Sequence, residues 1–172
     1  MEKLLPGFGG SAVLDADGLN AAASLLNAGR ALPHPAGELI LTPHPGEMSR
    51  LTGLSTSALA ADREGAACRF AREWNAVVVL KGARTVVAAP DGRVRVNPTG
   101  NPGLSRGGSG DVLAGMTAAL LACRLPAYEA AACAVYLHGA AADRAAAVHG
   151  EYGMLPHDIL PELGRMFAEH QR

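Results

Sequence analysis

Aromatic side chains and charge are both scarce in this chain. Aromatic residues make up 4% and charged residues 18% of the 172 residues, against 49% that are apolar. The formal net charge is −1 and the basic residues form no run, so the chain lacks the concentrated positive charge that binds nucleic acid or an anionic membrane. A chain this apolar is not expected to be disordered, and its length suits a single domain spanning residues 1–172.

Cysteines and long apolar runs are also few. The three cysteines, Cys68, Cys123 and Cys133, occur at spacings that match no paired metal motif. We expect them to be reduced and buried, as is typical of a cytosolic protein. No segment reaches the roughly 18 apolar residues of a membrane span, and the N-terminus lacks a basic segment followed by an apolar run. These absences favour a cytoplasmic protein with no membrane partner.

Short apolar runs alternate along the chain with segments of helical periodicity. Residues 76–80 (AVVVL) are apolar throughout, which predicts a central strand covered on both faces. Asp17 is expected to cap the first helix, and Ser55 or Ser57 the third. The alternation indicates an α/β layered fold with a mostly parallel sheet. The expected strands are 11–15, 38–42, 76–80, 85–89 and 93–97, the last two joined by a turn at 90–92; the expected helices are 17–27, 47–52, 55–74, 128–149, 158–170 and one that begins directly after Gly110.

The most distinctive segment is the glycine-rich stretch 97–110, which leads directly into a helix. Glycine permits positive φ, so backbone N–H groups can converge on one point, and the helix N-terminus adds free N–H groups and partial positive charge. This predicts an anion site, and phosphate is the commonest such anion. No Lys follows Gly110, so the segment is not a P-loop. An ionised Asp111 at its mouth could accept the proton of an attacking hydroxyl; the alternative is a tight turn in which Asp111 only caps the helix.

A second candidate site is the segment KGART, which follows the predicted central strand. Ligands bind at the C-terminal ends of strands in open α/β sheets. Lys81 or Arg84 could therefore meet nucleotide phosphates, and Gly82 would let the backbone approach a ligand. The alternative is a surface turn with a solvated lysine.

Polar side chains also follow the first two predicted strands. In the PHPGE segment, His44 could hydrogen-bond a polar substrate or move a proton, and Glu47 could bind a metal through water; a purely structural His44 is the alternative. After the first strand, three residues could line or support a substrate site: Asp15, Asp17 and Asn20. We expect His138 to pack within its helix and the other late histidines to lie on the surface, namely His149, His157 and His170.

Six motifs resemble, in their order, those of the ADP-dependent (S)-NAD(P)H-hydrate dehydratase family of the ribokinase-like superfamily: DADGLN, LTPHPGEMSRLTG, VVLKGARTVV, NPTGNPGLSRGGSGDVLAGMTAALLA, AVYLHGAAAD and EYGMLPHDI. The glycine loop and PHPGE are together specific to the family, whereas GSGD alone would indicate the superfamily. The resemblance implies a ribokinase-like three-layer α/β/α fold with a mostly parallel central sheet. It also implies a repair reaction, in which ADP phosphorylates the hydroxyl of hydrated NADH or NADPH, phosphate is eliminated and AMP is released.

The resemblance further implies roles for individual residues. The amides of Gly108, Ser109 and Gly110 would stabilise the transferring phosphoryl group, and Asp111 would take the hydroxyl proton. Mg²⁺ would be held by the nucleotide phosphates rather than by a metal site of the protein. The nicotinamide hydrate would lie near His44, Asp111 and Asn101, and the adenine nucleotide would contact Lys81, Gly82, Ala83, Arg84, Thr85 and Gly110.

The chain departs from the family pattern at its start. Family members carry a substantial part before the DADGLN strand, and here the chain begins almost at that strand, so we expect the C-terminal portion of the dehydratase domain with an exposed sheet edge. Pro156-His157 also stands where the family often has Ala-Ser. By resemblance, a homotetramer is expected. Two alternatives stay open: a ribokinase-like kinase of a small alcohol such as hydroxyethylthiazole, and a nucleotide-binding chain without activity.

Overall fold

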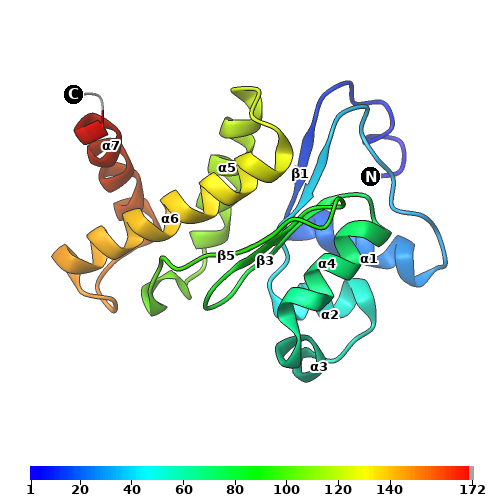
Figure 1. The fold of residues 1–172 in the computed structure, drawn as a ribbon, viewed down its shortest axis with the longest axis horizontal. Helices are drawn as coiled ribbons and strands as arrows, with labels where there is room; N and C mark the ends of the chain where they lie inside the picture. The colour runs from blue at the N-terminus through cyan, green and yellow to red at the C-terminus, as the bar shows by residue number, and fades with distance from the viewer. Residues whose placement is uncertain (171–172) are drawn as a thin grey trace.

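The computed structural model describes residues 1–170 and contains, within them, one five-stranded sheet in the order β1-β2-β3-β4-β5 (Figure 1). The pairs β1–β2 and β2–β3 are parallel, and the pairs β3–β4 and β4–β5 are antiparallel. The sheet is therefore mixed rather than mostly parallel. The reason is local: the connection from β3 to β4 is too short for the crossover that a parallel pair needs. The strands are β1 (Ala12–Leu14), β2 (Leu39–Leu41), β3 (Val77–Leu80), β4 (Val86–Ala88) and β5 (Val94–Val96).

Helices cover both faces of the sheet and complete the expected three layers (Figure 1). One face carries α1 (Asp17–Asn27), α2 (Pro45–Thr52), α3 (Thr56–Ala61) and α4 (Arg63–Glu73). The other carries α5 (Ser109–Ala122) and α6 (Ala127–His149), which pack against each other, and α7 (Ile159–His170) packs outside them on α6. Two short 3₁₀ turns, Pro102–Leu104 and Pro156–Asp158, lie in the connections.

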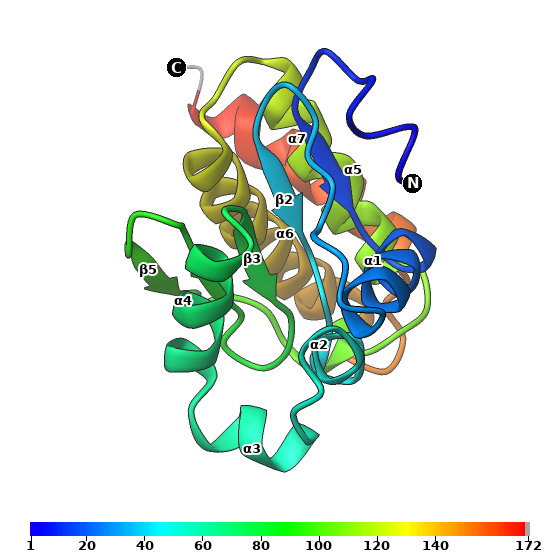
Figure 2. The same cartoon turned by 90° about the vertical axis from the view of Figure 1, so that its right-hand side faces the viewer.

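The core follows the two-residue period of the strands. In β3, Val78 and Leu80 join the apolar cluster under α1–α4, whereas Val77 and Val79 join the cluster under α5 and α6. All four residues are buried, which confirms the predicted central strand. Figure 2 shows β1 and β5 at opposite ends of the sheet, and β1 is only partly buried. Its outer edge has no partner strand within residues 1–170.

The expected helix over residues 55–74 is two helices. Ser55 caps the first, since its Oγ accepts a hydrogen bond from the Ala58 N–H at 3.1 Å. The helix stops at Asp62, where the backbone takes φ −145° and ψ 76°, and the Asp62 carboxylate caps α4 by accepting from the Gly65 N–H at 2.9 Å. A single helical period runs through both segments, so apolar spacing alone did not reveal the break.

Two smaller expectations were wrong. Asp17 lies in the first turn of α1, and the cap position belongs to Ala16 with φ 45° and no side-chain cap. Cys123 is exposed at the end of α5 rather than buried, while Cys68 and Cys133 are partly buried; all three are free thiols. Among residues 1–170, no helix combines the length and the apolar character that crossing a membrane requires.

Candidate functional site

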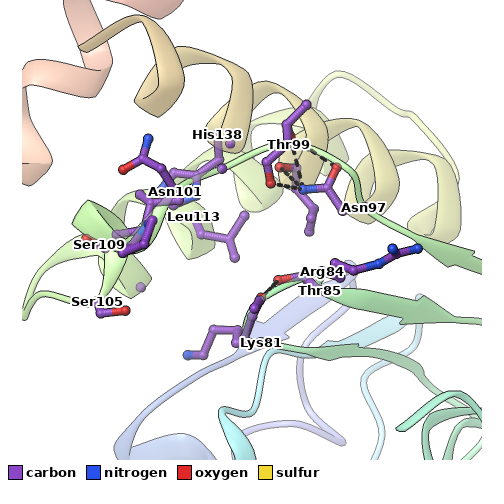
Figure 3. A pocket seen from close by; sticks show the side chains of 18 of the residues that line it. Lys81, Arg84, Thr85, Asn97, Thr99, Asn101, Ser105, Ser109, Leu113 and His138 are labelled. Atoms are coloured by element: carbon purple, nitrogen blue, oxygen red, sulfur yellow. Dashed lines mark hydrogen bonds between the residues drawn. The ribbon is translucent and has the colours of Figure 1, made fainter. Parts of the chain in front are cut away.

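A cavity of about 430 Å³ lies between the loop that follows β3 and the N-terminal end of α5 (Figure 3). Its walls contain every residue predicted to contact the nucleotide, and also Asn101 and Ser109. Gly108, Asp111 and His44 do not line it. The lining residues are Lys81, Gly82, Ala83, Arg84, Thr85, Asn97, Pro98, Thr99, Gly100, Asn101, Pro102, Leu104, Ser105, Ser109, Gly110, Leu113, Val135, His138 and Gly139.

The glycine loop meets the cavity at the first turn of α5. Gly108 takes the cap position with φ 94°, a conformation that favours glycine, and its carbonyl accepts the Val112 N–H at 3.2 Å. The Gly110 and Asp111 amides lie in the first turn, where N–H groups have no acceptor within the helix. The cavity wall formed by the start of α5 therefore carries free N–H donors and partial positive charge. The Asp111 side chain belongs to the same turn and is exposed.

Lys81 joins three of the sequence motifs. Its ammonium lies 2.7 Å from Asp15 Oδ1 and 3.7 Å from Glu47 Oε2, and all three side chains are at most 19% exposed. A Cβ added at Gly110 would lie 3.4 Å from Lys81 Nζ, so the ammonium sits against the first turn of α5. Lys81 is thus a partly buried, paired cation at the anion loop, not the solvated lysine of a surface turn.

His44 is the N-cap of α2. Its Nδ1 accepts hydrogen bonds from the N–H groups of Gly46 at 3.0 Å and Glu47 at 3.3 Å, and Glu47 Oε2 accepts the His44 N–H at 2.7 Å. Because Nδ1 uses its lone pair as an acceptor, the proton of the neutral ring is on Nε2, 3.4 Å from Glu47 Oε1. The ring is half exposed, so Nε2–H remains available to donate to a ligand.

The loop over residues 97–101 is fixed to α6 by a residue that sequence reasoning missed, Asp143. Its carboxylate accepts from the Gly100 N–H and from Asn101 Nδ2, both at 2.9 Å. The side-chain oxygen Oδ1 of Asn101 accepts the Gly103 N–H at 3.0 Å, so both ends of the side-chain amide predicted to contact substrate are engaged within the protein. A Cβ at Gly139 would lie 2.7 Å from the Thr99 carbonyl carbon, so only glycine allows this close approach.

Arg63 is a second residue that sequence reasoning did not assign to the site. From α4 its guanidinium donates to the carbonyls of Leu80 at 3.0 Å and Lys81 at 3.3 Å, and also to that of Ala83. Burial lowers the pKa of Arg63. Three carbonyl groups at the end of β3 and in the loop that follows it are therefore held by one cation from α4. The available signal was one charged residue in an otherwise apolar helix face.

We expect Arg63→Met to leave those carbonyls without their donor and to loosen the loop. Hydrogen bonds from a charged group contribute about 1.5–3 kcal/mol, so the free energy of unfolding should fall by about 2 kcal/mol. Denaturant unfolding measures this. Arg69→Met is the matched control, because Arg69 is an exposed arginine of the same helix whose contacts are at the surface, a 3.9 Å ion pair with Glu73 and a guanidinium 4.9 Å from the Phe70 ring centroid. Equal stabilities of the two variants would contradict the role of Arg63.

His138 is buried, as predicted, and it also lines the cavity. Desolvation lowers the pKa of His138 from 6.5 to about 4, and a hydrogen bond with the Ser109 backbone opposes this only partly. The imidazole is therefore neutral near pH 7. It lies on the wall opposite Lys81 and Thr85 (Figure 3).

This lowered pKa predicts acid destabilisation. Between about pH 6.5 and 4 the unfolded chain binds a proton at His138 that the native protein does not, so stability falls as pH falls through that window, at up to about 1.4 kcal/mol per pH unit. His138→Gln removes this component, so its unfolding free energy should fall less between pH 7 and 5 than that of the wild type. The exposed His149→Gln should keep the wild-type pH dependence. Identical pH profiles for all three proteins would refute the assignment.

Known proteins share both this sequence and this fold. A model of the NAD(P)H-hydrate dehydratase family matches residues 2–165. The bifunctional NAD(P)H-hydrate repair enzyme Nnr of Moorella thermoacetica is 51% identical over 160 residues, which are 93% of this chain and 30% of that protein. The ADP-dependent (S)-NAD(P)H-hydrate dehydratase of Bacillus subtilis is 43% identical over 141 residues, covering 80% of this chain and 51% of that one. The crystal structure of the B. subtilis ADP/ATP-dependent NAD(P)H-hydrate dehydratase, co-crystallized with ATP/Mg²⁺, has a TM-score of 0.82 at 40% identity and covers 92% of this chain and 55% of its own.

A mixed sheet between two helical layers, with a glycine loop at the start of α5, defines a ribokinase-like α/β protein. The chain belongs to the NAD(P)H-hydrate dehydratase family. It spans about half the length of the B. subtilis relative and less than a third of the Moorella one.

Proposed function

We propose that this chain carries the nucleotide site and the catalytic base of an ADP-dependent (S)-NAD(P)H-hydrate dehydratase, which returns hydrated NADH and NADPH to their redox-active forms. The observation that supports this most strongly is the Lys81 ion pair. Lys81 lines the cavity together with Gly110 at the amide end of α5, and it contacts Asp15 of DADGLN and Glu47 of PHPGE behind that wall. The proposal takes these four motifs as parts of one site.

In the proposed reaction, the substrate hydroxyl oxygen attacks the β-phosphorus of ADP and AMP leaves. Asp111 takes the hydroxyl proton. Of the amides expected from the resemblance (Gly108, Ser109 and Gly110), the Ser109 N–H already donates to the Arg106 carbonyl at 3.2 Å, so the proposal assigns the stabilisation of the transferring group to the Gly110 amide and adds the neighbouring Asp111 amide. The new phosphate ester then loses phosphate with the C–O electron pair, and a proton leaves the neighbouring carbon, which restores the double bond. The Nε2–H group of His44 would donate a hydrogen bond to the nicotinamide hydrate.

Mg²⁺ fits this site as a partner of the nucleotide. The cluster beside the anion loop has a formal net charge of −1, from Asp15, Glu47 and Lys81. This charge would repel a polyphosphate, and a divalent cation bound with the polyphosphate would compensate for it. Within residues 1–170 no group of three His, Cys, Asp or Glu side chains could hold a metal by itself. We therefore propose that Mg²⁺ is held by the phosphates and water and would supply charge neutralisation to phosphoryl transfer.

The test is incubation of the protein with ADP, Mg²⁺ and NADH hydrate while the absorbance of regenerated NADH is followed. Recovery of NADH together with AMP and phosphate supports the proposal. A stable phosphorylated product would favour a small-molecule kinase instead. Absence of turnover with nucleotide binding intact would assign this chain to nucleotide binding alone.

Assembly and location are part of the same proposal. The outer edge of β1 has no partner within the described residues, and exposed strand edges promote pairing with further strands. We propose a cytoplasmic homotetramer, as the family resemblance implies. Light scattering after size-exclusion chromatography measures the molecular mass, and a monomeric mass would rule out the tetramer.

A further inference from the structure

Two buried polar atoms in the described part of the chain have no hydrogen-bond partner, and both belong to residues of the cavity wall. They are Ser109 Oγ and His138 Nε2. Ser109 is 5% exposed and His138 6%. A buried polar atom without a partner costs about 1–3 kcal/mol, so two of them in one wall indicate an interaction that this state leaves incomplete.

The two residues lie together although they are far apart in the chain. Both residues line the cavity, the Ser109 backbone is close enough to the His138 ring to oppose the lowering of its pKa, and α5 packs against α6. Ser109 is the first residue of α5, between the cap Gly108 and the free amides of the first turn. Whatever holds Ser109 therefore sets the direction of the amides that would receive a phosphate.

We propose that His138 is a positioning residue: it holds Ser109 from behind the anion loop, and binding of a nucleotide phosphate completes a hydrogen bond between the Ser109 hydroxyl and the His138 ring. This extends the proposed function to a residue of the AVYLHGAAAD motif that the resemblance gave no role, and it rests on nucleotide binding at this cavity. His138 acts through the loop and need not touch the ligand.

The chemistry of the pair supports this. A neutral imidazole offers one acceptor nitrogen and a serine hydroxyl offers one donor, so the two unpartnered atoms are chemically matched. In the described structure, neither atom has another partner that this bond would disrupt. Phosphate bound to the neighbouring amides would order the first turn of α5, so the free energy of the new hydrogen bond would add to that of nucleotide binding.

Titration calorimetry with ADP and Mg²⁺ tests the proposal through a double-mutant cycle. His138→Leu and Ser109→Ala should each weaken ADP binding by about tenfold, the value of one hydrogen bond, and the double variant should weaken it little further. His138→Gln retains a polar end and should recover part of the loss. The control His149→Leu, an exposed histidine of the same helix, should bind ADP as the wild type does.

Thermal unfolding of every variant separates loss of folding from loss of binding, and imidazole ¹⁵N shifts of His138 recorded with and without ADP report the new bond directly. Multiplicative losses in the double variant would overturn the coupling, as would unchanged ADP affinity in His138→Leu or His138 shifts that do not respond to ADP. A wild-type protein that binds no ADP would overturn the proposed function as well. Failure of the cycle with wild-type binding intact would overturn only the role of His138.

Discussion

Asp111→Asn is expected to reduce NADH recovery by a factor of about 10²–10⁴ while leaving ADP binding nearly unchanged. A positioned general base contributes about that factor to a proton transfer, and an amide cannot take up the hydroxyl proton. Asp111 does not line the cavity, and its replacement removes a negative charge that would repel phosphate, so ADP affinity should not fall. The measurements are kcat from NADH absorbance and the ADP dissociation constant from calorimetry.

The matched control is Asp91→Asn. Asp91 is an exposed carboxylate in the turn between β4 and β5, where it pairs with Arg93, and it has no part in the proposed chemistry. Its variant should keep wild-type turnover and ADP affinity. If Asp111→Asn instead retains turnover, Asp111 only stabilises the helix N-terminus. If it loses ADP binding and turnover together, the residue belongs to the nucleotide site.

The fold was largely predictable because its signals are local. Period-two burial in β3, a hairpin turn at residues 90–92 and helical spacing in α6 each depend on neighbours in the sequence. The break at Asp62 was not predictable from the same spacing, since α3 and α4 continue one apolar period and only a cap hydrogen bond separates them. The antiparallel addition of β4 follows from a connection too short for a crossover, a cue that the alternating pattern obscured.

The candidate site was predictable in its residues and less so in its contacts. Every residue expected to meet the nucleotide lines one cavity, because strand ends and helix N-termini converge in this class of fold. The partners of those residues are long-range: Lys81 pairs with Asp15 across 66 positions, and Asp143 holds Gly100 from 43 positions away. No spacing rule links such pairs, so the roles of Arg63, Asp143 and His138 emerge only from the structure.

Lys81→Met is expected to cause the largest loss of stability among these variants. It removes the cation that two nearly buried carboxylates, Asp15 and Glu47, share. Breaking a buried ion pair from one side costs about 3–5 kcal/mol, and partial exposure of Lys81 places this case near about 3 kcal/mol. The control is the exposed Lys3→Met, which should change the free energy of unfolding by less than about 0.5 kcal/mol. Denaturant unfolding at pH 7 compares the two variants.

A double variant identifies the cause of that loss, because without the ammonium the carboxylates of Asp15 and Glu47 face each other uncompensated. Adding Asp15→Asn to Lys81→Met removes one of the two facing charges and should recover part of the loss at pH 7. If adding Asp15→Asn recovers none of the Lys81→Met deficit, that deficit arises from lost packing. In that case Lys81 would not be the electrostatic link between the motifs, and the proposed function would lose its main support.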